Sequence, residues 1–295
     1  MNIYKDITLI LVTYRSEKLI LKNLEVLKKF STIIVDNSNS EKLEIIIKKY
    51  ENIKLIRSSK NLGYGKANNL AVSFANTPFI LIINPDIILN ENSISALFEE
   101  FLKDPENIGI LGPSLYDKQM NRRTNGSKSF ISQLKGNKVL NKINNIPEDN
   151  ICCEFLMGCC YLMRRDFFNH LKGFDESFFM YFEDCDLCDR SLKNGKYIME
   201  IPSAKMIHLE NSSSQKNIFT NSKLALIHKI SCYIYLKKNL SLMYLITQLV
   251  KNFIDYFIRI FTNLVLLRFK KSYKNLLRVI SIILYISSIY KIMHN

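Results

Sequence analysis

The sequence predicts an α/β protein in which a mostly parallel sheet carries helices on both faces, followed by a C-terminal α-helical region. Three observations support this prediction. Apolar runs of strand length alternate with segments of helical periodicity through residues 7–83, each run ends in polar residues, and residues 213–295 combine basic charge with helical spacing. With 295 residues, 47% of them hydrophobic, the chain can bury the core of one large domain or of one domain with an appendage.

The first ninety residues carry the clearest pattern. Residues 7–12 form a continuous apolar run typical of a strand buried on both faces, and residues 16–30 repeat Leu and Ile at helical spacing after Ser16, a suitable N-cap. Further strands are predicted at 32–36, 53–57 and 79–83, and further helices at 41–50 and 65–76. This alternation indicates βαβ units, whose right-handed crossovers put helices on both faces of a parallel sheet.

The pattern is less regular after residue 90. Helices are predicted at 93–103 and at 183–194, the second ending before Gly195. Residues 113–150 are polar and predict a long loop with short strands, whereas residues 151–165 are apolar again. Arg122 and Arg123 in the predicted loop either reach an anionic ligand or are solvated surface charges.

The positive charge of the chain is concentrated at its C-terminal end. Residues 213–295 contain 13 Lys or Arg and one acid, Asp255, which is +12 of the total +14. Three helices are predicted at about 220–238, 240–269 and 272–293, and their longest uncharged apolar stretches are shorter than the roughly 20 residues that span a bilayer. This pattern predicts helices lying on an anionic membrane surface, or a bundle that packs on the rest of the chain or on a second copy in a homodimer. The apolar share disfavours a nucleic acid partner.

The cysteines and the first residues suggest a reducing compartment. The chain has seven Cys, an odd number, and its first residues show no charged segment followed by an apolar one, so we expect no signal peptide and a cytoplasmic protein. Free thiols are the main expectation. A zinc site is the alternative, because Cys185 and Cys188 have C-x-x-C spacing.

Three predicted strands end in polar residues: Thr13-Tyr14, Asp36-Asn37 and Asn84-Pro85-Asp86. In open α/β sheets, ligands bind at the carboxyl ends of the strands. These strand ends therefore predict one nucleotide-sized site. The alternative is that Asp and Asn merely start turns.

The same residues belong to a longer series of motifs. In chain order they are Val12-Thr-Tyr, Val35-Asp-Asn, the segment Asn61–Asn69, Asn84-Pro-Asp86, the segment Gly173–Asp186, and His208. This series resembles family 2 glycosyltransferases, in particular the rhamnosyltransferase-like enzymes of bacterial surface polysaccharide synthesis. The resemblance covers about residues 5–240, and Gly173–Arg190 is its most specific part. It implies a GT-A fold in residues 1–215, with a nucleotide-binding half at 1–90 and an acceptor half at 91–215, and leaves residues 216–295 as the basic amphipathic helical region.

The resemblance also implies where the donor nucleotide binds. Tyr14 would lie beside the pyrimidine, next to Thr13, and Asp36 would hydrogen bond to the base or the ribose. Asn61 and Gly63 would line the same wall, where glycine permits close approach of the backbone.

Asn84-Pro85-Asp86 occupies the place of the family's D-x-D metal motif. Asp86 is the expected carboxylate ligand of Mg²⁺ or Mn²⁺, and His208 is expected to complete the metal shell. Asn84 replaces the first acid of the motif, which leaves one anionic ligand fewer.

The general base is expected at the Glu183-Asp184 pair, after the aromatic run Phe178–Phe182. A carboxyl group against an apolar wall has a raised pKa, which suits a base. The family pattern assigns the base to Asp184, while Glu183 and Asp186 orient the loop or contact the acceptor. An ordinary acidic helix start is the alternative.

The predicted function is therefore that of an inverting glycosyltransferase. It would move a sugar, rhamnose from dTDP-rhamnose, to a hydroxyl group of a lipid-linked or polysaccharide acceptor at the inner face of the cell membrane. The alternatives are a UDP-hexose or UDP-N-acetylhexosamine transferase, a non-catalytic glycan-binding protein, and a nucleotidyltransferase. The last is disfavoured because no glycine follows the first strand.

Overall fold

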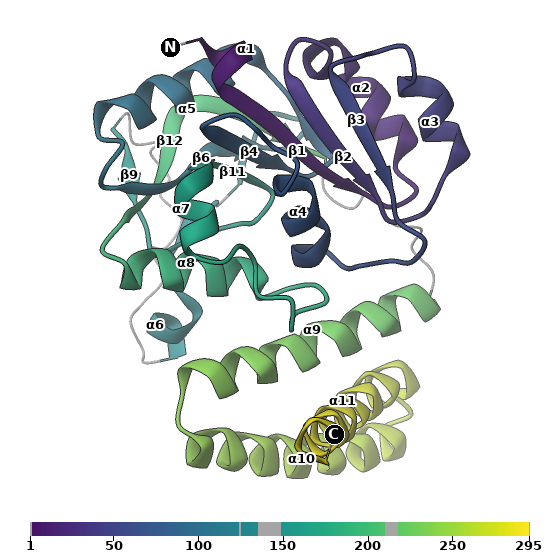
Figure 1. Ribbon diagram of the computed structural model, residues 1–295. Helices are drawn as coiled ribbons and strands as arrows, with labels where there is room; N and C mark the ends of the chain where they lie inside the picture. The colour runs from purple at the N-terminus through teal and green to yellow at the C-terminus, as the bar shows by residue number, and fades with distance from the viewer. Residues whose placement is uncertain (1, 124, 135–148, 210–217, 295) are drawn as a thin grey trace. The chain divides into compact units, whose positions relative to one another are not determined.

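The computed structural model describes residues 2–123, 125–134, 149–209 and 218–294 (Figure 1). The chain divides into two compact units. The α/β unit contains residues 1–176 and 183–214, and the helical unit contains residues 177–182 and 215–295. The predicted boundary at residues 215 and 216 lies outside the described residues. The short segment 177–182 is the part of the helical unit that the sequence did not predict.

The α/β unit alternates strands and helices as expected. Its strands are β1 (Ile7–Thr13), β2 (Ser31–Asp36), β3 (Ile53–Arg57), β4 (Phe79–Ile83), β5 (Ile87–Ile88), β6 (Ile108–Tyr116), β7 (Arg122–Arg123), β8 (Gly126–Ser127), β9 (Ile151–Cys152), β10 (Phe155–Leu156), β11 (Cys160–Arg164) and β12 (Tyr197–His208). Its helices are α1 (Ile3–Asp6), α2 (Glu17–Leu27), α3 (Glu41–Ile47), α4 (Gly65–Val72), α5 (Glu91–Lys103), α6 (Phe130–Leu134), α7 (Arg165–His170) and α8 (Glu183–Lys193).

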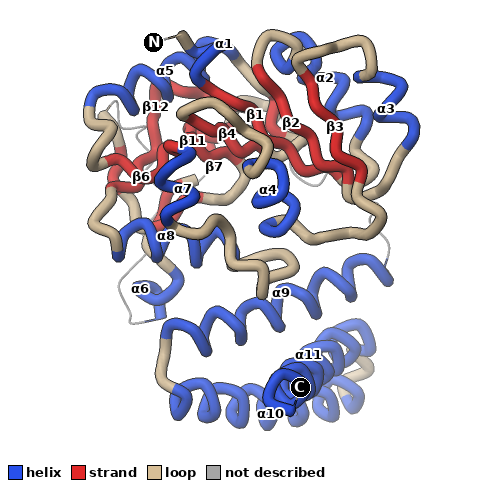
Figure 2. The backbone as a smooth tube through the Cα atoms, viewed as in Figure 1, coloured by secondary structure: helices blue, strands red, loops and turns tan. Residues whose placement is uncertain are grey.

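One large sheet organises this unit, with the strand order β3-β2-β1-β4-β11-β6-β12-β5 (Figure 2). The first four strands pair in parallel, which confirms the prediction for residues 7–83. From β11 onward antiparallel pairs enter, because β11 runs against both β4 and β6. In β12 the register shifts between Ile201 and Lys205, and the strand then pairs with β5.

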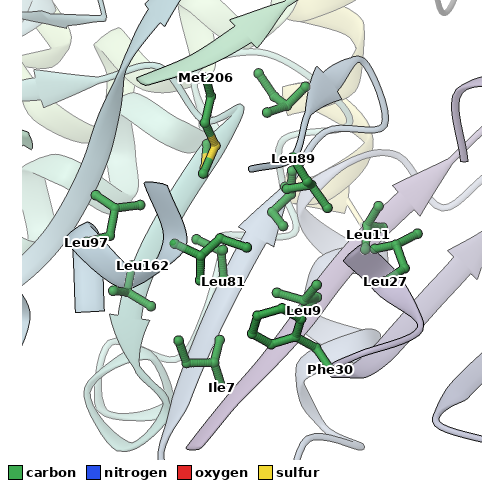
Figure 3. Close-up of a cluster of buried hydrophobic side chains, with 14 of the residues drawn as sticks. Ile7, Leu9, Leu11, Leu27, Phe30, Leu81, Leu89, Leu97, Leu162 and Met206 are labelled. Atoms are coloured by element: carbon green, nitrogen blue, oxygen red, sulfur yellow. The ribbon is translucent and has the colours of Figure 1, made fainter. Parts of the chain in front are cut away.

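Both faces of the sheet are buried. One cluster contains Ile7, Leu9 and Leu11 of β1 with side chains of α2 and α5, and Figure 3 shows part of it. The other contains Ile10 of the same strand with side chains of α4, α7 and α8. Alternate residues of a strand point to opposite faces, so a strand covered on both sides is apolar throughout.

The region after residue 113 differs from its prediction. Pro113–Tyr116 were expected in a polar loop, but they continue β6 and are buried with the rest of that strand. Their burial is possible because β12 and β7 pair with β6 on its two sides. Residues 135–148 of the predicted loop lie outside the described residues.

The helical unit contains α9 (Ile218–Asn239), α10 (Leu242–Val265) and α11 (Phe269–His294), which confirms three predicted helices. Each of the three packs against the other two. Nevertheless, α10 leaves a row of large apolar side chains exposed, here called the α10 apolar face. It consists of Met243, Ile246, Val250, Phe253, Ile254, Phe257, Ile258, Phe261 and Val265. Within the described residues, no helix combines the length and the apolar character that crossing a bilayer requires.

Candidate active site

The ends of β1 and β2 bring the first predicted site residues together. Thr13 and Asp36 are register partners in these parallel strands, and both side chains are buried. Thr13 Oγ1 is buried without a hydrogen-bond partner among the described residues. Tyr14, the next residue, is 44% exposed, so its ring is accessible to a ligand at this edge of the sheet.

The Asp36 carboxylate is hydrogen bonded to the loop that follows β2. Its Oδ1 accepts hydrogen bonds from the Ser38 N–H (2.9 Å) and Ser38 Oγ (2.6 Å), and its Oδ2 accepts from the Ser40 N–H (2.6 Å). Three donors thus hold the carboxylate before any ligand arrives. A contact between Asp36 and a base or ribose stays a prediction, while its role in shaping the loop is visible.

The loop before α4 is tied to the end of β2 by Asn37. Asn37 Nδ2 donates to the Gly63 carbonyl (2.9 Å), and its Oδ1 accepts from the Leu62 N–H (3.3 Å). Asn61 Oδ1 accepts from the Gly63 N–H (2.9 Å), and Gly63 has φ of +82°, a left-handed conformation that glycine adopts without strain. The predicted residues Asn61 and Gly63 therefore build a tight turn beside the two strand ends.

Asn84 and Asp86 lie after β4, opposite the start of β11. The Asn84 N–H donates to the Cys159 carbonyl (2.8 Å), and Asn84 Oδ1 is buried without a partner in the described structure. Asp86 is 6% exposed, and its Oδ1 lies 3.5 Å from His208 Nε2. His208 reaches Asp86 because it pairs with Ile87 where β12 meets β5. The structure thus brings the two predicted metal ligands together from positions 122 residues apart.

Asp184 stands at the start of α8 and faces the segment before β11. Its Oδ1 accepts from its neighbour Cys185 N–H (2.9 Å) and its Oδ2 accepts from the Gly158 N–H (3.2 Å). Asp184 is half-buried, and burial raises its pKa although these backbone donors oppose the shift. The carboxylate is therefore held in place and is more basic than an ordinary aspartate.

Glu183 has a different environment, although it is the adjacent residue. It is 5% exposed, and its Oε2 has no hydrogen-bond partner among the described side chains. Burial, followed by the nearby charge of Asp184, raises its pKa well above the usual range. A β-carbon added to Gly65 at the start of α4 would lie 3.8 Å from that of Glu183, so Glu183 packs against the first turn of α4. It supports the site from inside the protein.

Gly158 and Cys159 connect the two halves of the site. Gly158 donates to Asp184, its carbonyl accepts from the Tyr64 hydroxyl, and the Cys159 carbonyl accepts from Asn84. Burial raises the pKa of the Cys159 thiol, and so do the nearby charges of Cys160, Asp86 and Asp184. The two-residue segment Gly158-Cys159 thus joins the candidate metal ligands to the candidate base.

Sequence reasoning assigned no individual role to three of these connecting residues: Asn37, Tyr64 and Gly158. Asn37 and Tyr64 lie inside motifs that drew attention for their neighbours. Gly158 interrupts an apolar run, and a glycine at such a position is a sign of close backbone approach.

The donor set fits a divalent cation that also binds substrate oxygens. In the described residues, no group of three or more His, Cys, Asp or Glu side chains could hold a metal. Asp86, His208 and the unpartnered amide oxygen of Asn84 nonetheless offer one carboxylate, one imidazole and one neutral oxygen. Mg²⁺ commonly takes one or two carboxylates and completes its shell with phosphate oxygens, and imidazole suits Mn²⁺.

Other candidate residues have protein partners. Arg122 forms an ion pair with the buried Glu200 (2.6 Å) and is only 16% exposed, so its interpretation as a solvated charge is wrong. Arg123 pairs with Asp117 (3.0 Å). The seven cysteines are free thiols. A surface hollow lined by residues such as Glu106, Arg164 and His170 contains none of the predicted site residues.

Comparison with known families now identifies the chain. The domain described as glycosyl transferase family 2 matches residues 8–172, more than half of the sequence. The chain belongs to glycosyl transferase family 2. The matched region contains the strand ends, Asn84, Asp86 and Gly158, and it ends before Glu183, Asp184 and His208.

Several similar proteins are named as rhamnosyltransferases. The N-acetylglucosaminyl-diphospho-decaprenol L-rhamnosyltransferase of Mycobacterium tuberculosis is 29% identical over 232 residues, covering 70% of this chain and 74% of the relative. Rhamnosyltransferase WbbL of Escherichia coli is 28% identical, with coverage of 68% and 82%. The dTDP-rhamnosyl transferase RfbF of Shigella flexneri is 25% identical, with coverage of 81% for both chains.

Solved structures confirm the fold. The mannosyltransferase PcManGT of Pyrobaculum calidifontis, in complex with GDP-Man and Mn²⁺, matches with a TM-score of 0.53 at 13% identity, covering 79% of this chain and 63% of that one. TarS of S. aureus matches with a TM-score of 0.53 at 17% identity, covering 81% and 41%. This chain therefore spans less than two thirds of both structures. The likeness establishes the GT-A fold predicted from the motifs.

Proposed function

We propose that this glycosyltransferase moves rhamnose from dTDP-rhamnose, with inversion, to a hydroxyl group of a lipid-linked or polysaccharide acceptor. The observation that carries this proposal is the segment Gly158-Cys159, in which the Gly158 N–H donates to Asp184 and the Cys159 carbonyl accepts from the Asn84 N–H. A base and a diphosphate site joined in this way suit transfer from a nucleotide diphosphate sugar. The rhamnosyltransferase relatives support the choice of sugar.

In the proposed reaction, Asp184 acts as the general base. Its carboxylate accepts the proton of the acceptor hydroxyl as the hydroxyl oxygen attacks the anomeric carbon. The bond between that carbon and the diphosphate oxygen breaks, and the nucleoside diphosphate leaves with the electron pair. A single displacement inverts the anomeric centre. The raised pKa of Asp184 favours proton uptake, since a base works best when its pKa approaches the working pH.

Asp86 and His208, with the Asn84 amide oxygen, would hold Mg²⁺ or Mn²⁺ together with diphosphate oxygens. The bound ion would supply positive charge against the departing diphosphate. Thr13, Tyr14 and Asp36 would form the nucleoside wall, and the turn at Asn61 and Gly63 would border it. Glu183 would support Asp184 from within the protein rather than touch the acceptor.

The test is a donor panel with a matched pair of variants. The purified full chain would be titrated with dTDP-rhamnose, UDP-glucose and UDP-N-acetylglucosamine in the presence of Mn²⁺ or Mg²⁺, with binding measured by calorimetry. Tightest binding of dTDP-rhamnose supports the proposal if a chelator and the Asp86→Ala substitution weaken that binding while Asp184→Asn retains it. Preference for a UDP-sugar would replace the donor while keeping the mechanism. Absence of binding by every donor would favour a non-catalytic glycan-binding protein.

The helical unit supports a second part of the proposal, namely that the enzyme works at the inner face of the cell membrane. The α10 apolar face exposes Met243 (70%), Phe257 (48%) and Phe261 (54%), among others, to solvent. Large exposed apolar surfaces mark sites of interaction with proteins or membranes. Residues 213–295 carry a net charge of +12, so an anionic bilayer is the surface that complements both the apolar and the charged character.

Vesicle binding tests this part. Full-length protein should sediment with vesicles of phosphatidylglycerol and phosphatidylcholine, and replacing Phe253 and Phe257 by serine should release it. Ile45→Ser is the matched control, because Ile45 is an apolar side chain of α3 that is 76% exposed outside the face. If the protein ignores the vesicles and sediments as a dimer that the Phe253 and Phe257 changes dissociate, the face is a homodimer contact instead.

A further inference from the structure

Two adjacent residues before the proposed base have strained backbone. Tyr181 has φ of +70° and Phe182 has φ of +67°, and α8 begins at the next residue. Left-handed backbone is unfavourable for bulky side chains such as these, and such residues persist only where their surroundings hold them. A strained pair directly before Glu183-Asp184 therefore needs an identifiable restraint.

The restraint comes from α9. Ser231 Oγ donates a hydrogen bond to the Met180 carbonyl (2.8 Å), and Ser231 is 2% exposed. The His228 ring, one helical turn earlier, contacts both strained residues edge-on, with ring centroids 5.2 Å from Tyr181 and 5.3 Å from Phe182. Ser231 and His228 are three residues apart, so both side chains lie on the same side of the helix.

A third side chain extends this contact along α9. Tyr235 lies seven residues after His228, and its ring centroid is 5.4 Å from that of Phe182. All these contacts lie within the helical unit, to which residues 177–182 belong. The peptide bond between Phe182 and Glu183 then joins this unit to α8, which belongs to the α/β unit.

We infer that His228 and Ser231 are positioning residues for sugar transfer. They hold Tyr181 and Phe182 in the left-handed conformation from which α8 starts, and this conformation sets the direction in which Asp184 leaves the loop. The inference rests on the proposed role of Asp184 as the base. It assigns to α9 a task in catalysis that is separate from any membrane contact made by α10.

If the inference holds, the feature of His228 that matters is its aromatic ring, and the feature of Ser231 that matters is its hydroxyl group as a hydrogen-bond donor. His228→Ala and Ser231→Ala should each weaken the loop, whereas His228→Phe keeps an aromatic ring and Ser231→Thr keeps the hydroxyl group. The matched control is Ser272→Ala in α11. Ser272 is also buried, and its Oγ donates to the Ile260 carbonyl (3.1 Å) within the helical unit, but it does not contact residues 177–182 through this bond.

The experiment combines hydrogen–deuterium exchange with kinetics of the full chain. We expect His228→Ala and Ser231→Ala to speed exchange in residues 177–186 and to lower kcat about tenfold with dTDP-rhamnose and a synthetic lipid-diphosphate N-acetylglucosamine, with the dissociation constant of dTDP unchanged. His228→Phe and Ser231→Thr should restore kcat, and Ser272→Ala should resemble the parent protein.

Two results would overturn the inference. One is unchanged exchange in residues 177–186 in both His228→Ala and Ser231→Ala. The other is faster exchange with kcat unaltered, or with kcat and dTDP affinity falling together as in a partly unfolded protein. Failure of the proposed function looks different, because the parent protein itself would then transfer no sugar from dTDP-rhamnose, while the exchange measurement would still report whether α9 holds the loop.

Discussion

Replacing Gly158 by alanine should disturb the proposed base through a single contact. A β-carbon at this position would lie 2.8 Å from Asp184 Cβ and 3.3 Å from its Oδ2. Non-bonded carbon atoms pack at about 3.5 Å or more, so the two groups must separate by about 0.7 Å. Gly158 is not among the residues with positive φ, so alanine fits the backbone and acts only through its methyl group.

The expected loss is large for one methyl group. Because a displacement of about 1 Å in a catalytic group costs about a hundredfold in rate, a shift of about 0.7 Å should lower kcat roughly 10- to 100-fold. Overpacking should also reduce the free energy of unfolding by about 1–3 kcal/mol. Transfer kinetics, donor-binding calorimetry and thermal unfolding would be measured on the same preparation, and donor affinity should change little.

Gly195→Ala separates this effect from general destabilisation. Gly195 has φ of +72°, and nothing lies within 4 Å of an added β-carbon. Alanine there costs about 1–2 kcal/mol of backbone strain without approaching Asp184, so it should lower the melting temperature and leave kcat intact. Our reasoning is refuted if Gly158→Ala retains parental kcat, or if Gly195→Ala loses activity to the same extent.

Three further predictions concern charge. Asp184→Asn should keep donor binding and lower kcat about 10²- to 10⁴-fold, as expected for loss of a general base; a smaller loss in steady-state transfer assays would point to another base. Because burial raises the pKa of Asp184, kcat/KM should fall on the acid side of the pH profile with an apparent pKa above the ordinary aspartate value of about 3.9; an apparent pKa at or below that value would contradict the desolvation argument. The raised pKa of Glu183 means that it keeps its proton to higher pH in the folded than in the unfolded state, so its contribution to stability falls as pH rises above the ordinary glutamate pKa of 4.5. The melting temperature of Glu183→Gln relative to the parent should therefore increase with pH over that range, and a pH-independent difference would refute the assignment.

The N-terminal half of the sheet was predictable because the apolar pattern of each strand there shows which of its faces are buried. The run Ile7–Val12 is apolar at nearly every position, which only a strand covered on both faces can satisfy. The order of strands after β4 was not predictable from local pattern. β11 inserts between β4 and β6 in antiparallel orientation, and β5 is only two residues long, so neither leaves a periodic signal in the sequence.

In the proposed site too, some residues were predictable from local sequence pattern and others were not. Polar residues at the ends of apolar runs pointed to Thr13, Asp36 and Asp86, because parallel strands bring their carboxyl ends to one edge. The pairing of His208 with Asp86 depended on a strand partner more than a hundred residues away, and only the family resemblance suggested it. The local bonds of Asp36 could have been suspected, since Asp often hydrogen bonds to backbone N–H groups a few residues onward.

The contrast between Glu183 and Asp184 explains why adjacent acids can have different tasks. Successive residues of a helix point about 100° apart, so the first turn of α8 cannot direct both carboxyl groups to the same place. The β-carbon of Glu183 lies against Gly65, and ionisation of its buried carboxyl group is opposed by burial and by the charge of Asp184. Asp184 is half-buried and accepts a hydrogen bond from the Gly158 N–H, a donor that stabilises its ionised form. A base must ionise and must also reach its substrate. Asp184 is the more exposed of the two acids and is held by the Gly158 and Cys185 N–H groups, so it suits the proposed role better than Glu183 does.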